Sequence, residues 1–203
     1  MAQECCRLCR KIFSDNMHLI QLYCKHMQCD SCFFKHNKNH EHPVCAVCNV
    51  SLLPCKSVKE AVLFGQGFFY FQSPTSNCYE KSVQFFESAI LENPNNFLSQ
   101  KYLGWSLFKV ASHQKAAIAL LTSIDILEDE GIVDNDARSR TYLGVIFLLA
   151  DNPFAALPHL KKALLLKPDN TINIERLQLA IDSIAQIPKP RFMIGRESSL
   201  FCW

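Results

Sequence analysis

From about Val58 onward, apolar residues recur every three or four positions, which is the spacing of amphipathic helices. Two stretches also share a Tyr-Leu-Gly triplet, an Ala twelve residues after the Gly, and a Leu four residues later. These landmarks are Gly104, Ala116 and Leu120 in one stretch, and Gly144, Ala156 and Leu160 in the other. An earlier stretch with similar apolar spacing closes at Pro94. The pattern predicts three helix-turn-helix repeats in which small residues let the paired helices approach closely.

These landmarks resemble the tetratricopeptide repeat family, whose unit is a helix-turn-helix of about 34 residues. Gly104 and Gly144 are 40 residues apart, so about six extra residues are expected in the polar linker Glu128–Asp136. Such a stack needs a cap on its last repeat, and Ile174–Ile187 is predicted to supply it because its apolar residues share one helical face. Residues 188–203 then form a tail, either a strap across the solenoid or a docking peptide.

Cysteine and histidine are concentrated in residues 1–55, which hold nine of the 11 cysteines and five of the seven histidines. Eight of these side chains form close pairs with one or two residues between the partners. The pairs are Cys6 and Cys9, Cys24 and His26, Cys29 and Cys32, and Cys45 and Cys48. Such pairs converge on one metal, and a zinc ion takes four ligands in a tetrahedron. The eight ligands therefore predict two zinc ions without an open coordination position, which is typical of structural sites.

The spacing and order of these ligands resemble the RING finger family, in which the two zinc sites interleave. The resemblance implies one zinc on Cys6, Cys9, Cys29 and Cys32, and the other on Cys24, His26, Cys45 and Cys48. In RING-type ubiquitin ligases, the zinc-bound module docks a ubiquitin-conjugating enzyme that carries ubiquitin. Carried over residue by residue, that docking surface would involve Leu8, Phe33, Ala46 and Asn49.

Three positions depart from the pattern of many active RING ligases. His36 stands where a Trp is common, and Ala46 where a proline is often found. Asn49 follows the last ligand, where a cation often bridges the conjugating enzyme and ubiquitin. Asn still donates a hydrogen bond there, but without the charge of Arg. These departures favour a non-enzymatic role, whereas Leu8 and the intact ligand set favour a ligase.

In tetratricopeptide repeats the first helix of each repeat lines a concave face, and the resemblance implies a peptide groove there. Its residues would be Lys101, Trp105, Phe108, Lys109, Arg138, Val145 and Leu148. Chaperone-binding members clamp a terminal carboxylate with Lys and Asn, but Trp105 and Val145 occupy positions where Asn would be expected. The groove instead suits a peptide whose hydrophobic anchors alternate with acidic residues. The alternative, that Trp105 and Phe108 are inter-helix core, is equally open, because aromatic residues at helical spacing often fill cores.

Charge and hydropathy exclude several classes of partner. The chain carries 21 Lys and Arg against 19 Asp and Glu, so neither nucleic acid nor a membrane surface is expected to bind it. No apolar run reaches the ~20 residues that span a bilayer, and no secretory signal opens the chain. We therefore expect an intracellular, reducing compartment, the cytoplasm or nucleus, where clustered thiols bind metal. Motifs for nucleotide binding or a catalytic triad are not found.

The sequence thus predicts a mainly α protein with a RING-like zinc-binding domain at 1–55, an all-α tetratricopeptide solenoid with its capping helix at 56–187, and a tail at 188–203. The two domains should have separate sources of stability, metal in one and apolar packing in the other. We expect a RING-type ubiquitin ligase, a transferase that recruits substrate through the groove and acts by positioning, with no covalent intermediate or catalytic residue of its own. The alternative is a non-enzymatic adaptor or chaperone with a structural zinc module.

Overall fold

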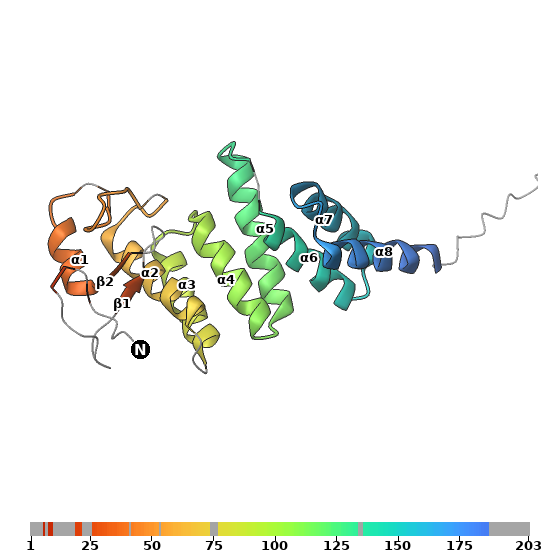
Figure 1. The fold of residues 1–203 in the computed structure, drawn as a ribbon, viewed down its shortest axis with the longest axis horizontal. Coiled ribbons are helices and arrows are strands. Elements are labelled where there is room, and N and C mark those ends of the chain that lie inside the picture. Colours follow the sequence, from red (N-terminus) through yellow and green to blue (C-terminus); the bar gives the residue numbers. More distant parts are fainter. Residues whose placement is uncertain are drawn as a thin grey trace, which may run out of the picture.

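The computed structural model describes residues 6, 8–9, 19–21, 26–40, 42–52, 54–73, 77–133 and 136–186. Cys24 and the predicted tail at 188–203 lie outside the described residues. The described chain forms two short strands followed by helices (Figure 1). The strands are β1 (Leu19–Gln21) and β2 (Met27–Cys29). The helices are α1 (Asp30–Asn37), α2 (Val58–Gln72), α3 (Cys78–Glu92), α4 (Phe97–Lys109), α5 (His113–Asp129), α6 (Ala137–Leu149), α7 (Pro153–Leu166) and α8 (Thr171–Gln186).

The N-terminal module consists of short elements joined by tight turns. β1 and β2 form an antiparallel pair in which Leu19 lies opposite Cys29, and α1 begins directly after β2. Beyond α1, the Cys45 backbone N–H donates to the Val50 carbonyl and closes a loop. Asn49 in this loop has φ of 54°, a left-handed conformation that Asn adopts more readily than most residues. The loop geometry therefore gives a structural reason for Asn at this position.

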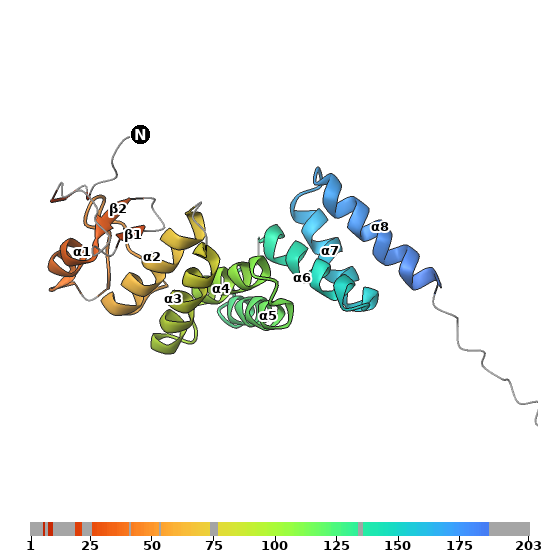
Figure 2. The same cartoon turned by 90° about the horizontal axis from the view of Figure 1, so that it is seen from below.

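The remaining helices pack as pairs, α2 with α3, α4 with α5, and α6 with α7, and α8 packs on α7 (Figures 1 and 2). The predicted helical repeats are confirmed, and α8 lies where the capping helix was expected. Glycines bring the paired helices together: a Cβ on Gly104 would lie 2.6 Å from Leu120, and one on Gly144 would lie 2.5 Å from Leu160. None of the described helices is both long and apolar enough to cross a bilayer.

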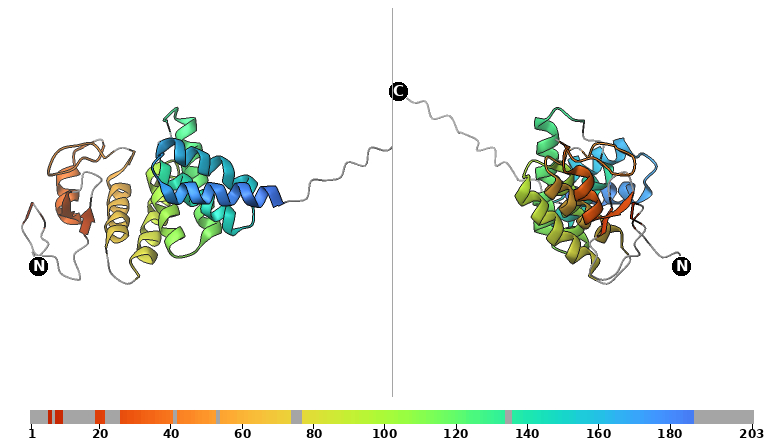
Figure 3. Two further views of the ribbon diagram at one scale, coloured as in Figure 1. Left: turned by 45° about the vertical axis from the view of Figure 1, so that its right-hand side comes forward. Right: turned by 90° about the vertical axis from the view of Figure 1, so that its left-hand side faces the viewer.

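One cluster of buried side chains joins the N-terminal module to the repeats. Phe33 and Leu52 of the module belong to it together with Phe64 of α2, and it continues as far as Leu143 of α6. This differs from the expectation of two separately stabilised domains. The physical reason is size, because a module of about 50 residues buries too little apolar surface by itself. Its buried apolar side chains instead share a cluster with those of α2, which contacts β1 and α1 (Figure 3).

The joint between the module and the solenoid is polar and buried. Glu60, which is 1% exposed, accepts hydrogen bonds from the Lys56 backbone N–H at 2.7 Å and from the side-chain amides of Asn93 at 3.0 Å and Asn96 at 2.5 Å. The Asn96 amide also donates to the Cys55 sulfur at 3.7 Å. Burial, reinforced by the charge of Glu60, raises the pKa of Cys55 to about 12, so this thiol is unreactive. These contacts tie the end of the module to the turn between α3 and α4.

Candidate metal centres and the inner face of the repeats

Four cysteines of the N-terminal module converge on one point. The sulfur atoms of Cys6, Cys9, Cys29 and Cys32 all lie within 4.8 Å of one another. Cys29 ends β2 and Cys32 lies in the first turn of α1, so the turn from strand to helix brings their sulfurs together. Cys6 and Cys29 are buried, Cys32 is half-buried and Cys9 is exposed. The structure therefore brings together the four residues that the RING resemblance assigns to one metal.

A second group consists of His26, Cys45 and Cys48, whose ligand atoms also lie within 4.8 Å of one another. His26 directly precedes β2, and the two cysteines belong to the closed loop after α1. The Val47 backbone N–H donates to the Cys45 sulfur at 3.4 Å. The fourth residue that the resemblance assigns here, Cys24, lies outside the described residues. Each of the two groups could hold a metal ion.

The electrostatics of the four-cysteine group favour a bound cation. The Cys29 backbone N–H donates to the Cys6 sulfur at 3.4 Å. Burial by itself raises the pKa of Cys6, but the backbone N–H groups of Cys9, Cys29 and Leu8 outweigh it and lower the pKa to about 6. Burial and the neighbouring thiols raise the pKa of Cys32. Four adjacent thiolates repel one another, so a cation is needed for all four to ionise together.

The residues expected to contact a conjugating enzyme differ in exposure. Leu8 is 43% exposed, Asn49 is exposed and Ala46 is half-buried. Phe33 is fully buried and belongs to the cluster shared with α2. The expectation that Phe33 forms part of a docking surface is therefore wrong. Because α1 packs against α2, Phe33 is covered by the solenoid and is a core residue.

Asn37 is a structural residue that the sequence analysis missed. It is 1% exposed, and its amide nitrogen donates to the carbonyls of Phe33 and Val44, each at 3.0 Å. Its side-chain oxygen accepts from the Val44 backbone N–H at 2.7 Å. Asn37 thereby fastens the end of α1 to the segment that carries Cys45. The sequence holds no signal for this role, because the partners are backbone groups that the fold brings close.

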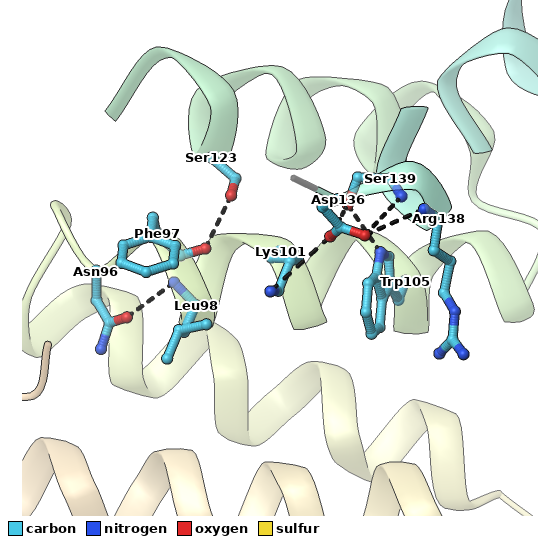
Figure 4. Close-up of polar contacts among 9 residues, drawn as sticks. All are labelled: Asn96, Phe97, Leu98, Lys101, Trp105, Ser123, Asp136, Arg138 and Ser139. Atoms are coloured by element: carbon cyan, nitrogen blue, oxygen red, sulfur yellow. Dashed lines mark hydrogen bonds and ion pairs between the residues drawn. The ribbon is translucent and has the colours of Figure 1, made fainter. Parts of the chain in front are cut away.

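Trp105 lies in the core of the solenoid rather than on an open groove. It is 7% exposed, and its ring centroid lies 4.9 Å from that of Tyr102 and 5.9 Å from that of Phe71. The indole N–H donates to the Ser139 hydroxyl at 3.0 Å, which joins α4 to α6 (Figure 4). The sequence leaves two roles open for Trp105. The role as a core residue between helices is correct, and the role as an exposed residue of the groove is wrong.

Most other predicted groove residues are half-buried, because one side of each side chain packs on a neighbouring helix and the other faces solvent. Phe108 is half-buried and stacks on Tyr142 of α6, with ring centroids 4.2 Å apart. Val145 and Leu148 are half-buried, and Leu148 packs on the cluster between α7 and α8. Lys109 is exposed. The apolar members of the groove thus serve mainly in packing, and its exposed members are Lys109 and Arg138, whereas Lys101 is largely covered.

Two cations cover the Trp105 ring. The Arg138 guanidinium lies 4.6 Å and the Lys101 ammonium 5.5 Å from the ring centroid. Lys101 also pairs with Asp136 at 3.8 Å (Figure 4). Arg138 is exposed, so a guanidinium stacked on one aromatic face can still direct its N–H edge toward a ligand.

A cavity of about 270 Å³ lies where α5 passes into α6. Most of its wall is apolar, formed by Phe97, Ile124, Leu127, Ile132 and Val133. The polar lining residues are Lys101, Ser123, Asp136 and Ser139 (Figure 4). The long linker between these helices, which the repeat spacing predicts, therefore forms part of a cavity wall.

No protein-family model matches the chain, and no curated protein sequence does so either. Among solved structures, the first TPR of Spaghetti (RPAP3) bound to the HSP90 peptide SRMEEVD is similar, with a TM-score of 0.51 and 15% identity over 63% of this chain and 96% of that one. MamA is similar with a TM-score of 0.53 and 16% identity over 62% of this chain and 68% of that one. The helical part is a tetratricopeptide-repeat-like solenoid. Identities this low show the fold alone.

The first helices of the second and third repeats are basic in composition, and two of their cations, Lys109 and Arg138, are exposed. These helices, α4 and α6, contain cations and no Asp or Glu: Lys101, Lys109, Arg138 and Arg140. Burial raises the pKa of Tyr142 on α6 and the charge of Asp136 adds to the rise, whereas the charges of Arg138 and Arg176 oppose it. The whole chain has a net charge of +2, so the excess of positive charge along α4 and α6 is local.

Proposed function

We propose that this chain is a non-enzymatic adaptor whose solenoid binds an acidic segment of another protein and whose N-terminal module is held by two zinc ions. The observation that carries the proposal is the pair of exposed cations Lys109 on α4 and Arg138 on α6, two helices that contain no Asp or Glu. Complementary charge guides encounter and selects partners. The similar TPR of Spaghetti is bound to the peptide SRMEEVD, in which three of the seven residues are acidic.

Arg138 and Lys109 are the cations that would meet such a segment. Both are exposed, whereas Lys101 is paired with Asp136. The Trp105 ring restrains the Arg138 guanidinium, so less conformational entropy is lost when a carboxylate binds it. A guanidinium binds a carboxylate through two parallel hydrogen bonds, which makes Arg138 the more selective of the two.

The geometry of the two ligand groups supports zinc. The sulfurs of Cys9 and Cys29 are 3.9 Å apart, and the Cys45 sulfur lies 3.6 Å from His26 Nδ1. With zinc–sulfur and zinc–nitrogen bonds of about 2.3 Å and about 2.0 Å, the edges of a tetrahedron are about 3.8 Å and about 3.5 Å. Thiolates with an imidazole are a donor set typical of structural zinc. Metal analysis of the purified chain should find two zinc ions, and one or none would contradict this part of the proposal.

Fluorescence anisotropy with the labelled peptide Gly-Ser-Asp-Glu-Leu-Glu-Asp-Ser-Gly tests the adaptor function. We expect the 203-residue chain to bind it. The double variant Lys109→Glu with Arg138→Glu should bind at least about tenfold more weakly, because attraction becomes repulsion. The matched control, Lys115→Glu with Lys162→Glu, makes the same change of net charge on exposed cations of α5 and α7. Absence of binding by the unmodified chain, or equal losses in both double variants, would contradict the proposal.

Ubiquitin transfer is a second candidate function, favoured by the exposure of Leu8. This residue is 43% exposed beside the four-cysteine group, where the docking surface of a RING ligase is expected. A transfer assay with a panel of ubiquitin-conjugating enzymes tests it, with Leu8→Ala as the variant that should abolish transfer while zinc stays bound. Asn49→Arg should raise transfer by supplying a cation. If the unmodified chain and Asn49→Arg are both inactive with every enzyme, this second function is excluded.

A further inference from the structure

α8 begins in the same way as α6, the first helix of the third repeat. The Asn170 side chain accepts a hydrogen bond from the Asn173 backbone N–H at 3.2 Å, and the Asp136 side chain accepts one from the Ser139 backbone N–H at 3.3 Å. In both helices the capping residue lies three positions before the amide that it binds. α8 packs on α7 and α6, as α6 packs on α5 and α4. α8 therefore occupies the position of the first helix of a fourth repeat.

The face of α6 that contacts its second helix, α7, has a counterpart on α8. Arg140 Nη1 lies 3.3 Å from His159 Nδ1 of α7, and the Phe147 ring stacks on the His159 ring with centroids 5.5 Å apart. Alignment of the two helices at their capping residues places Ile174 and Ile181 at the corresponding positions of α8. These side chains are 50% and 43% exposed. Within the described part of the chain, no second helix covers them.

A groove of about 480 Å³ lies between α8 and the end of α7 (Figure 2). Its described lining residues are apolar except for Lys161: Leu164, Leu165, Pro168, Ile174 and Leu177. Leu165 is 78% exposed. Ligand pockets occupy about 300–1,000 Å³, so the groove has room for more than one side chain. Covering it would remove apolar surface from water and stabilise the end of the solenoid.

The segment that follows α8 in the sequence is rich in large apolar residues. They are Phe192, Met193, Ile194, Leu200, Phe201 and Trp203. Pro188 and Pro190 separate these residues from α8. Because proline does not continue a helix, the chain is expected to turn there. The sequence thus provides a turn and then the kind of side chain that the groove accepts.

This segment is long enough to reach the groove. Ile174 lies 12 positions before Gln186, the last residue of α8, which is about 18 Å along the helix axis. An extended chain spans about 3.3 Å per residue, so about six residues cover this distance. Residues 191–203 also cover it as a helix, with a length of about 20 Å. Either conformation brings apolar side chains beside Ile174.

Gln178 limits where the segment can lie. It is exposed and occupies the position on α8 that Gly144 has on α6. A Cβ on Gly144 would lie 2.5 Å from Leu160, so only glycine lets α7 approach α6 as closely as it does. A helix cannot approach α8 in the same way over the longer Gln178 side chain. The groove beside Ile174 and Leu177 is therefore the place that the segment can fill.

Covalent connection favours this segment over a separate partner. A segment joined by a short flexible linker has an effective concentration in the millimolar range. A separate protein at lower concentration would have to bind correspondingly more tightly to displace it. The segment is thus the favoured occupant of an apolar groove that begins about 18 Å away.

We infer that residues 191–203 fold back onto the groove between α7 and α8 and complete the fourth repeat in place of a second helix. The inference does not depend on the proposed adaptor function. The apolar face of α8 then belongs to the interior of the protein, and its isoleucine side chains are not a docking site for another protein. The solenoid is closed at this end by its own chain.

Photo-cross-linking on the 203-residue chain tests the inference. Benzoylphenylalanine, a photoreactive amino acid, is placed at Phe192 in one sample and at Phe201 in another, and cross-linked peptides are identified by mass spectrometry. We expect cross-links to residues 161–177, which include the groove. A mixture of unlabelled and nitrogen-15-labelled chains distinguishes cross-links within one chain from those between two copies. We expect them within one chain.

A pair of double variants tests whether the groove itself is covered. Leu165→Asp with Ile174→Asp should lower the yield of these cross-links at least about fivefold, because burying an unpaired charge is unfavourable. The matched control, Leu91→Asp with Ile118→Asp, makes the same change at side chains that are 84% and 60% exposed on α3 and α5, and should keep the yield. Circular dichroism compares the helical content of the two variants.

Three outcomes would overturn the inference. Cross-links between two chains would make a second copy the occupant of the groove. Cross-links confined to residues 178–203, or none at all, would show that the segment does not reach the groove. Equal yields in the two double variants would show that it lies elsewhere. Each outcome leaves peptide binding by α4 and α6 untouched, so the adaptor function stands or falls by its own experiment.

Discussion

Glu60 is 1% exposed, and its two carboxylate oxygens accept three hydrogen bonds from neutral donors. One donor is the Lys56 backbone N–H at the end of the N-terminal module, and the others are the amides of Asn93 and Asn96 between α3 and α4. A buried ionised group is tolerated when it accepts several such bonds. The three donors depend on the same carboxylate, so a single residue fixes the position of the module against the first repeat.

Replacing Glu60 therefore has a specific expected cost. Glu60→Ala should lower the free energy of unfolding by about 3 kcal/mol or more, because each buried donor left without an acceptor costs about 1–3 kcal/mol. Lys59→Ala is the matched control at the next position, where an exposed ion pair with Glu92 contributes at most about 1 kcal/mol. Urea unfolding followed by circular dichroism gives both values. Similar small losses in the two variants would show that the joint is unimportant.

Trp105 combines a packing role with a hydrogen bond across the repeats. Trp105→Ala should lower the free energy of unfolding by about 3–5 kcal/mol, because it leaves a large cavity and removes the bond to Ser139. Phe154→Ala is the control, since this aromatic residue on α7 is 59% exposed and should lose less than about 1 kcal/mol. Denaturant melts measure both. If Trp105→Ala lowered the free energy of unfolding by less than about 1 kcal/mol, Trp105 would not be a core residue, and its role as an exposed groove residue would be open again.

At the scale of helices, close approach within each pair outweighs intrinsic helix propensity. Gly67, Gly104 and Gly144 occupy the interiors of α2, α4 and α6, although Gly costs about 1 kcal/mol relative to Ala in a helix. A Cβ at each position would meet a side chain of the partner helix at less than 3.0 Å. The partner Leu120 is fully buried and has little room to move. The glycines therefore fix the distance between the paired helices.

Gly104→Ala tests this balance because the two effects have opposite signs. Helix propensity alone predicts a gain of about 1 kcal/mol, whereas overpacking against Leu120 predicts a loss of about 1–3 kcal/mol. We expect the loss. In a Leu120→Ala background the collision with Leu120 is removed and only the tight contact with the Ala116 carbonyl oxygen at 3.2 Å remains. The same change at position 104 should therefore cost clearly less there, and the double-mutant cycle isolates the contact with Leu120. Stabilisation by Gly104→Ala in the unmodified background would contradict the close approach.

At the scale of the whole molecule, the N-terminal module and the solenoid share one core. Phe33 and Cys45 are buried in the same cluster as Val62 and Phe64 of α2. Cys45 also belongs to a group that could hold a metal ion, so under the proposed zinc sites one residue would both bind metal and pack in the core. Loss of metal is therefore expected to affect the first repeat as well as the module.

Metal removal tests this coupling. Stripping the chain with EDTA should lower the melting temperature of the helical circular dichroism signal by about 4–8 °C, equivalent to roughly 2 kcal/mol in a protein of this size. His26→Ala should act in the same direction, because it removes one ligand of the second group. Added zinc should restore the stripped chain but not the variant. An unchanged helical melt after complete metal removal would show that the two parts are stable independently.

The sequence alone determined features that depend on local spacing. Helical periodicity predicted the repeats and the capping helix, because it records which residues of a helix face the same side. Close Cys and His pairs predicted eight candidate metal ligands, since a short spacing lets two ligands converge on one metal, and the resemblance to the RING finger family implied which pairs would share a metal. The landmark glycines predicted close helix approach, and the 40-residue interval predicted a long linker. Each of these signals is contained within a few turns of the chain.

Only the tertiary structure decided which residues are buried and which partners they have, because those partners are distant in the sequence. Trp105 and Phe33 belong to the core because α6 and α2 cover them, which periodicity within one helix cannot show. Asn37 and Glu60 became structural residues through partners that the fold brings close. The cavity beside Ile132 depends on how far the linker holds two repeats apart. Burial is a property of packed surfaces, and the relative placement of those surfaces is set by all the contacts of the fold together.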